Sequence, residues 1–187
     1  MNICEVIRYR RSVFPVDYIQ KAIPKSVLEE LLECANAAPT HKLTQPWRYV
    51  VFHQEGLKKL ADVLQSLYKA TVDSTLFSEK KYHSISDKVL KSGAVMAICV
   101  EFSGKVPEVE ELASVACSVQ NMWLAASDMG LGAYWSTPVF LNDLQKALQL
   151  ESNVQCLGLF YLGYPKQHTP RLGTRSPIEE KVTWVST

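Results

Sequence analysis

Two short segments near the start of the chain combine side chains that could hold a ligand. Arg10-Arg11-Ser12 offers two permanently charged guanidinium groups and a hydroxyl, donors that suit a phosphate. Residues 38–47 read Ala-Pro-Thr-His-Lys-Leu-Thr-Gln-Pro-Trp, and the two prolines that bracket the polar side chains predict a rigid loop presenting hydrogen-bond donors. A site for an anion beside a loop that can meet a polar ring edge indicates a bound phosphorylated cofactor.

Each segment also has an ordinary structural interpretation. Basic residues complement the dipole at the end of a helix, so Arg10 and Arg11 could simply be a solvated helix end. Residues 38–47 could be a plain connection, and a lone histidine such as His41 is more often a structural donor than a catalytic group. No carboxylate in the neighbouring sequence offers itself as its partner. Neither GxGxxG nor GxxxxGK[ST] occurs, so side chains must do most of the holding of any phosphate.

A third segment with binding potential is Gly130-Leu-Gly-Ala-Tyr-Trp-Ser-Thr-Pro138. Its glycines allow a close backbone approach, and Trp135, Ser136 and Thr137 could line a flat ring. The same residues also fit an ordinary helix end followed by a strand. The residues alone leave both interpretations open.

Composition and charge restrict the classes of function. The chain has 187 residues, of which 47% are hydrophobic and 21% charged, and we expect a single domain over 1–187. A formal net charge of +1 gives no general attraction to nucleic acid or to an anionic membrane. The chain shows no signal-peptide pattern and no apolar run of membrane-spanning length, which favours a cytoplasmic protein.

The cysteines and histidines form no recognisable ligand pattern. The five cysteines are odd in number and widely spaced, so we expect buried reduced thiols rather than a disulfide framework. The four histidines are too scattered for a metal site, and no metal is expected. No G-x-S-x-G nucleophile motif occurs either.

Hydrophobic spacing predicts the elements that position these segments. Helices are expected over residues 2–9, 26–38, 57–67, 108–129 and 141–148. Strands are expected over residues 47–52, 94–102, 133–136, 154–164 and 182–185. Helices thus alternate with buried strands, which predicts a layered fold with one sheet.

Four stretches carry more specific expectations. The apolar run 94–102 predicts a central strand covered on both faces. The helix over 108–129 is apolar almost all round and is expected in the core or at a subunit contact. Residues 71–92 predict a mobile connection or a loosely packed helix over the site, and Pro15 predicts an extended link.

In this order and spacing, the segments resemble the nitroreductase family of FMN-dependent oxidoreductases, most of all the small bacterial NAD(P)H nitroreductases. The likeness extends over nearly the whole chain. The matching blocks are Arg10-Arg11-Ser12, the loop Ala-Pro-x-x-x-x-x-Gln-Pro-Trp, Gly130-x-Gly with Trp135-Ser-Thr, and Leu162-Gly163-Tyr164-Pro165. One position departs from the family pattern, because Leu43 stands where many members carry an asparagine whose amide contacts the flavin.

The resemblance implies an α+β fold with a mostly antiparallel central sheet flanked by helices. It also implies a homodimer with FMN at the interface and a C-terminal extension that pairs with the partner subunit. Arg10 and Ser12 would then hold the phosphate and ribityl end, with Arg11 at ribityl or ring oxygens. His41 would come from the partner subunit, and Trp135, Ser136 and Thr137 would border the cofactor. Arg171 and Arg175 would be extra contacts to the FMN phosphate or to a nicotinamide phosphate.

The implied activity is transfer of hydride from NADH or NADPH through FMN to a nitroaromatic, quinone or similar small acceptor. The flavin carries this chemistry, so no catalytic side chain is expected. Two alternatives remain open: a flavin-binding or interaction module with little turnover, and a specialised dehydrogenase or dehalogenase of the same family.

Overall fold

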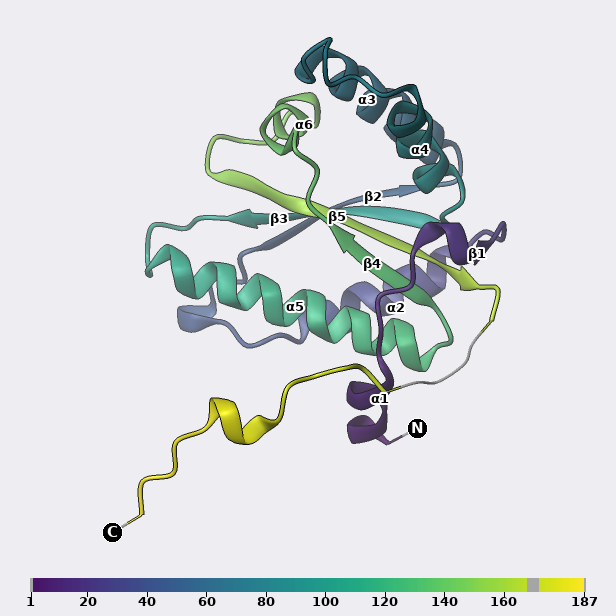
Figure 1. Ribbon diagram of the computed structural model, residues 1–187. Coiled ribbons are helices and arrows are strands. Elements are labelled where there is room, and N and C mark those ends of the chain that lie inside the picture. The colour runs from purple at the N-terminus through teal and green to yellow at the C-terminus, as the bar shows by residue number, and fades with distance from the viewer. Residues whose placement is uncertain (1, 168–171, 187) are drawn as a thin grey trace.

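A five-stranded sheet organises the fold in the computed structural model, which describes residues 2–167 and 172–186 (Figure 1). The strands are β1 (Tyr18–Ile19), β2 (Trp47–His53), β3 (Ala94–Glu101), β4 (Gly132–Ser136) and β5 (Val154–Pro165). Their order is β1-β5-β3-β2, with β4 also paired to β5, and every strand pair is antiparallel. This confirms the antiparallel sheet of an α+β fold.

Helices cover both faces of this sheet (Figure 1). They are α1 (Ile3–Tyr9), α2 (Lys25–Asn36), α3 (Glu55–Thr71), α4 (Glu79–Leu90), α5 (Glu108–Asp128) and α6 (Leu141–Ala147). Helices α2 and α5 pack on one face, and α3, α4 and α6 pack on the other. Strand β3 is therefore buried along residues 94–100, as its continuous apolar sequence predicts.

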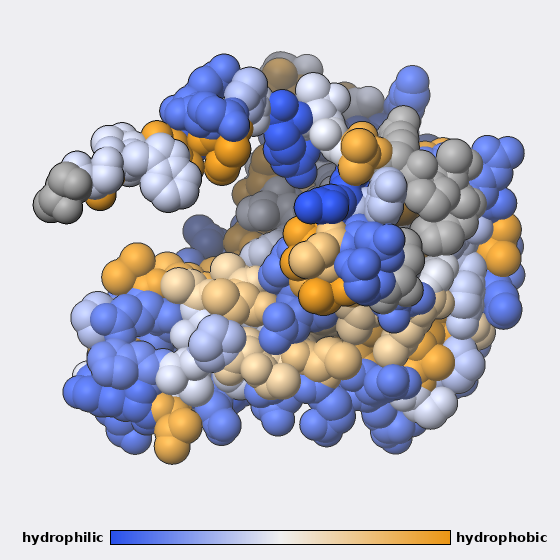
Figure 2. Space-filling model, turned by 90° about the horizontal axis from the view of Figure 1, so that it is seen from below, coloured by the Kyte–Doolittle hydropathy of each residue, from blue (hydrophilic) through white to orange (hydrophobic). Residues whose placement is uncertain are grey.

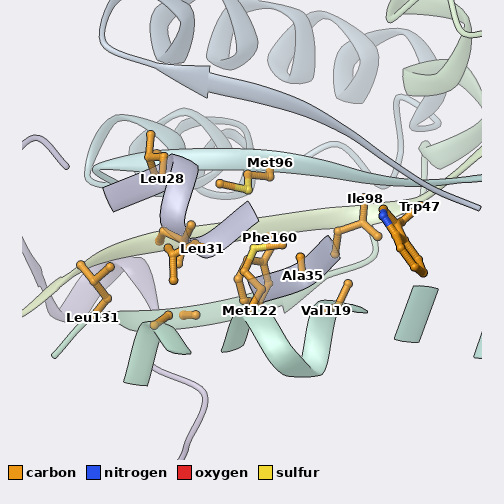
Figure 3. Close-up of a cluster of buried hydrophobic side chains, with 14 of the residues drawn as sticks. Leu28, Leu31, Ala35, Trp47, Met96, Ile98, Val119, Met122, Leu131 and Phe160 are labelled. Atoms are coloured by element: carbon orange, nitrogen blue, oxygen red, sulfur yellow. The ribbon is translucent and has the colours of Figure 1, made fainter. Parts of the chain in front are cut away.

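The larger core lies between the sheet and helices α2 and α5 (Figure 3). Leu31 from α2, Met122 from α5 and Phe160 from β5 have no exposed surface. Burying each such side chain contributes about 1.5–3 kcal/mol before the entropy cost of ordering it. Helix α5 is thus anchored through its inner face, which fixes the residues on its outer face and at its two ends.

Of the two alternatives expected for residues 71–92, the structure has the loosely packed helix rather than the mobile connection, but not over the Arg10–Ser12 segment. Helix α3 continues to Thr71, and α4 follows as a regular helix that packs on α3 rather than over the Arg10–Ser12 segment. The ring of Phe77 contacts those of Tyr68 and Tyr82, at centroid distances of 5.5 and 5.9 Å. The periodicity of α4 is weak because most of its apolar face is only partly buried.

Three further expectations need correction. Residues 182–185 form no strand: the described tail has a 3₁₀ turn over Ile178–Lys181, then an exposed stretch without a strand partner in the part of the chain described. Pro15 begins a 3₁₀ turn rather than an extended link, since its fixed φ suits a turn start. Finally, Cys4 and Cys117 are exposed, because each lies on the outer side of a helix.

The glycine of the Leu162-Gly163-Tyr164-Pro165 block makes room for a buried tyrosine. A Cβ on Gly163 would lie 2.3 Å from Cδ2 of Tyr18, whose hydroxyl donates to the carbonyl oxygen of Val13 at 2.8 Å. Tyr18 therefore ties the segment after Ser12 to β5.

We expect Gly163→Ala to lower the free energy of unfolding by about 1–3 kcal/mol, because the methyl group must displace the Tyr18 ring. Urea denaturation measures this. Gly56→Ala is the matched control: in α3 an added Cβ meets nothing nearer than 3.9 Å, so stability should hold or rise. Equal stability of the two variants would contradict the packing role of Gly163.

Candidate functional site

Helix α1 and strand β4 together position Arg10-Arg11-Ser12. Asn2 caps α1 by accepting a hydrogen bond from the backbone N–H of Glu5, and the helix ends at Tyr9 with Arg10 as its C-cap. The chain then extends along β4: Ser12 bridges Ala133 in parallel, and the N–H of Val13 donates to Ala133 at 3.0 Å. The structure thus joins this segment to the strand that carries Trp135 and Ser136.

Three guanidinium groups gather at this place. Arg10 lies over the ring of Trp123, 4.4 Å from its centroid. Burial, followed by the positive charges of Arg11 and Arg175, lowers the pKa of Arg10. A Cβ on Gly173 would lie 3.1 Å from Cζ of Arg11 and 3.0 Å from Nη1 of Arg175, so the tail at Gly173 lies close to both side chains.

The arginine cluster has unused hydrogen-bonding capacity. Nη1 of Arg10 is buried and has no hydrogen-bond partner among the described residues. Burying a charged donor without an acceptor is costly, and gathering like charges adds to that cost. An anion bound here would relieve both. Arg175 therefore joins the predicted cluster, whereas Arg171 lies outside the described residues.

Trp135 and Ser136 are placed by a glycine that the sequence analysis missed. Gly158 in β5 has a φ of 145°, and a Cβ there would lie 2.6 Å from both Nε1 of Trp135 and the carbonyl oxygen of Ser136. A glycine inside an otherwise buried strand is the signal that could have identified it. The indole N–H of Trp135 is buried without a hydrogen-bond partner in the described structure.

Trp123, Trp135 and Phe160 form a small aromatic group near Arg10. Trp123 of α5 meets Phe160 of β5 edge-on, with centroids 5.3 Å apart. Phe160 is the cross-strand partner of Trp135. The indole N–H of Trp123 also lacks a hydrogen-bond partner among the described residues. Thr137, just beyond β4, is exposed.

His41 lies elsewhere, at the other end of α5. It begins a 3₁₀ turn, His41–Leu43, and its Nδ1 is hydrogen-bonded to the carboxylate of Glu110. The partner that the neighbouring sequence lacks thus comes from α5. Glu110 and Trp123 are thirteen residues apart on that helix, which corresponds to about 20 Å. A single chain therefore does not bring His41 to Arg10.

The loop around His41 has an unusual backbone. Lys42, Leu43 and Gln45 have φ values of 48°, 56° and 44°. Leu43 stands at the tip with 80% of its surface exposed. None of the described residues covers the Leu43 side chain, so only a contact from another molecule would bury it.

Neither a metal-binding cluster nor a membrane-spanning helix is present in the part of the chain that the structure describes. Residues 2–167 and 172–186 contain no group of histidine, cysteine or acidic side chains that could hold a metal ion. Across the same residues, no helix is both long and apolar enough to span a membrane.

Comparison with known proteins adds to these observations. The model of the nitroreductase family matches residues 7–164. A Bacillus subtilis protein named "Putative NAD(P)H nitroreductase YfhC" is 26% identical over 96% of this chain and 92% of its own length. A crystal structure of a nitroreductase-like family protein from Bacillus cereus has a TM-score of 0.84 at 29% identity, covering 99% of this chain and 96% of that one.

More distant structures share the fold. The FMN-dependent nitroreductase NfnB from Mycobacterium smegmatis, solved with NADPH, has a TM-score of 0.77 at 16% identity and covers 97% of each chain. Oxidised iodotyrosine deiodinase, bound to FMN and 3-iodo-L-tyrosine, has a TM-score of 0.73 at 21% identity, covering 99% of this chain and 100% of that one. With a family model that matches most of its length, the chain belongs to the nitroreductase family.

Proposed function

We propose that the protein is an FMN-dependent oxidoreductase that transfers hydride from NADH or NADPH to a nitroaromatic, quinone or similar acceptor. The observation that carries this proposal is the cluster of Arg10, Arg11 and Arg175 beside β4. The family supports it, and so does the use of FMN by structural neighbours.

The residues present fit the phosphorylated end of FMN. The buried Nη1 of Arg10 lacks an acceptor, and a phosphate supplies acceptors and negative charge together. Arg11 and Arg175 add charge, and the Ser12 hydroxyl is a further donor on the same segment. Side chains therefore offer what a glycine-rich phosphate loop offers in other folds.

The remainder of the cofactor would lie along β4. Trp135 and Ser136 belong to β4, and Thr137 follows it. The buried indole N–H of Trp135 has no acceptor among the described residues, so it is available as a donor. Bound FMN would supply the hydride chemistry. These side chains would bind and orient it and exclude water, and we assign no proton-transferring residue.

We further propose that the active form is a homodimer. The outer side of α5 exposes Val109, Ala113, Ala116, Cys117 and Gln120, an almost entirely uncharged stripe. Figure 2 shows apolar residues gathered in a band on the face seen from below. A two-fold axis through the middle of α5 would pair this helix with the α5 of a second copy in antiparallel orientation. The start of α5 in one chain would then lie beside the end of α5 in the other. His41 of one chain would then approach Arg10 of the other, because Glu110 and Trp123, the residues of α5 that they contact, lie on either side of the middle of that helix.

Two other apolar features support a partner chain. A groove of about 410 Å³ lies between α1, α2 and α5, where Ile3, Val6 and Leu124 are among its lining residues. The C-terminal tail runs away from the body (Figure 1), and Trp184 and Val185 are 88% and 93% exposed. A second copy would cover such surfaces, which monomers seldom expose together.

The activity is tested by mixing the FMN-loaded protein with NADH or NADPH without oxygen and then adding single acceptors. Flavin bleaching followed by reoxidation with a nitroaromatic or quinone is the expected result. Bleaching without reoxidation by any acceptor would favour a flavin-binding module, and reoxidation by 3-iodotyrosine alone would favour a dehalogenase. Flavin that neither nucleotide bleaches would contradict the proposed reaction. The Ala70→Glu variant, altered on the exposed side of α3, should behave like the wild type.

A further inference from the structure

The loop that carries His41 is fastened to α5 by a contact that the proposed function does not require. Nδ1 of His41 is hydrogen-bonded to Glu110 in the first turn of the helix. The two side chains are 51% and 39% exposed, and pairs this open to water add little to stability. The contact therefore matters more for the placement of the imidazole than for the free energy of unfolding.

The rest of the loop is held in a conformation that it would not adopt freely. Lys42, Leu43 and Gln45 are left-handed without being glycine, and such residues persist only where surrounding contacts hold them. Thr40 Oγ1 accepts a hydrogen bond from the Gln45 N–H at 3.0 Å, and Arg48 donates to the Gln45 carbonyl oxygen at 2.9 Å. Those two hydrogen bonds hold the backbone of the loop, whereas the hydrogen bond to Glu110 holds the His41 ring itself.

The hydrogen bond to Glu110 determines which nitrogen of the imidazole remains available for a ligand. A carboxylate only accepts hydrogen bonds, so Nδ1 carries the proton in this contact. The ring can then present only its Nε2 edge to a ligand, in an orientation fixed from behind. Glu110 itself stays on α5, on the far side of the ring from that edge.

We propose that Glu110 is a positioning residue of the flavin site, which holds His41 so that Nε2 meets FMN bound by a second copy of the chain. This inference rests on the proposed function. Glu110 does not touch the cofactor and acts only through His41.

The test compares variants of the FMN-loaded full-length protein. Glu110→Ala should raise the FMN dissociation constant about two- to tenfold, as expected for one lost hydrogen bond. It should shift the visible flavin band in the same direction as His41→Ala and leave the Tm of the apoprotein unchanged, because FMN itself raises the Tm of the loaded protein. Glu110→Gln retains a carbonyl acceptor for Nδ1 and should restore the wild-type band and affinity. Glu108→Ala, an exposed acid in the same turn, is the matched control and should change neither.

A double variant separates positioning from an independent effect. If Glu110 acts only through His41, adding Glu110→Ala to His41→Ala should change affinity and spectrum no further. Additive effects, an unchanged Glu110→Ala variant, or a Glu110→Gln variant as impaired as Glu110→Ala would each overturn the inference. A wild-type protein that binds no FMN would instead overturn the proposed function and this inference with it.

Discussion

Replacing Arg10 with alanine is expected to weaken FMN binding by about 1.5–3 kcal/mol, which is roughly 10- to 150-fold in Kd. The variant removes the guanidinium whose buried Nη1 has no acceptor within the described residues. It also lessens the positive charge that Arg10, Arg11 and Arg175 gather around one place. Titrating the apoprotein against FMN fluorescence measures the change.

Two further variants identify which property of Arg10 accounts for the loss of FMN affinity. Arg8→Ala removes an exposed cation from the same helix and should leave the FMN Kd within about twofold of the wild type. Arg10→Lys keeps a charge but loses the planar fork, so it should recover only part of the affinity. If Arg10→Ala binds FMN as tightly as the wild type, the phosphate lies elsewhere.

The second large effect is expected from Ala116→Glu on the exposed side of α5. In a two-fold dimer the substitution brings two like charges together in an apolar contact, which costs several kcal/mol. We expect the dimer dissociation constant to rise about 100-fold or more, with loss of FMN, because His41 leaves with the partner chain. Sedimentation velocity followed at the flavin band reports mass and cofactor together.

The matched control places the same charge on the opposite face of the sheet. Ala70 is also an exposed helical alanine, and Ala70→Glu should remain a flavin-loaded dimer. Circular dichroism should show equal helix content in both variants, since neither residue is buried. A wild-type protein that sediments as a flavin-loaded monomer would contradict the dimer proposal.

The parts of the fold that could be predicted are those with a strong hydrophobic pattern. The run 94–102 has no polar residue until Glu101, and β3 occupies residues 94–101 between two other strands. Helix α5 begins directly after Pro107, as a helix start should. Helix α4 was expected only as one of two alternatives because only Val89 is fully buried on it, so its apolar stripe is faint. The tail was misassigned because β-branched and aromatic residues such as Val182 and Trp184 suggest a strand, yet no strand edge lies beside them among the described residues.

Some parts of the candidate site could likewise be predicted from the sequence, and others could not. Side-chain chemistry alone singled out Arg10-Arg11-Ser12, and the family resemblance linked it to Trp135-Ser-Thr, which the bridge between Ser12 and Ala133 brings close. The contact between His41 and Glu110 spans 69 positions, so no local pattern could reveal it. The role of Gly158 depends on where the Trp135 ring lies, which only tertiary packing decides.

The visible absorption spectrum of the protein shows whether this chain holds FMN. The protein is incubated with excess FMN, passed over a desalting column and scanned. We predict flavin absorption bands that co-elute with the protein at about one FMN per chain, as expected when each two-fold-related site is filled. Protein that emerges colourless after this treatment would mean that the chain does not hold FMN.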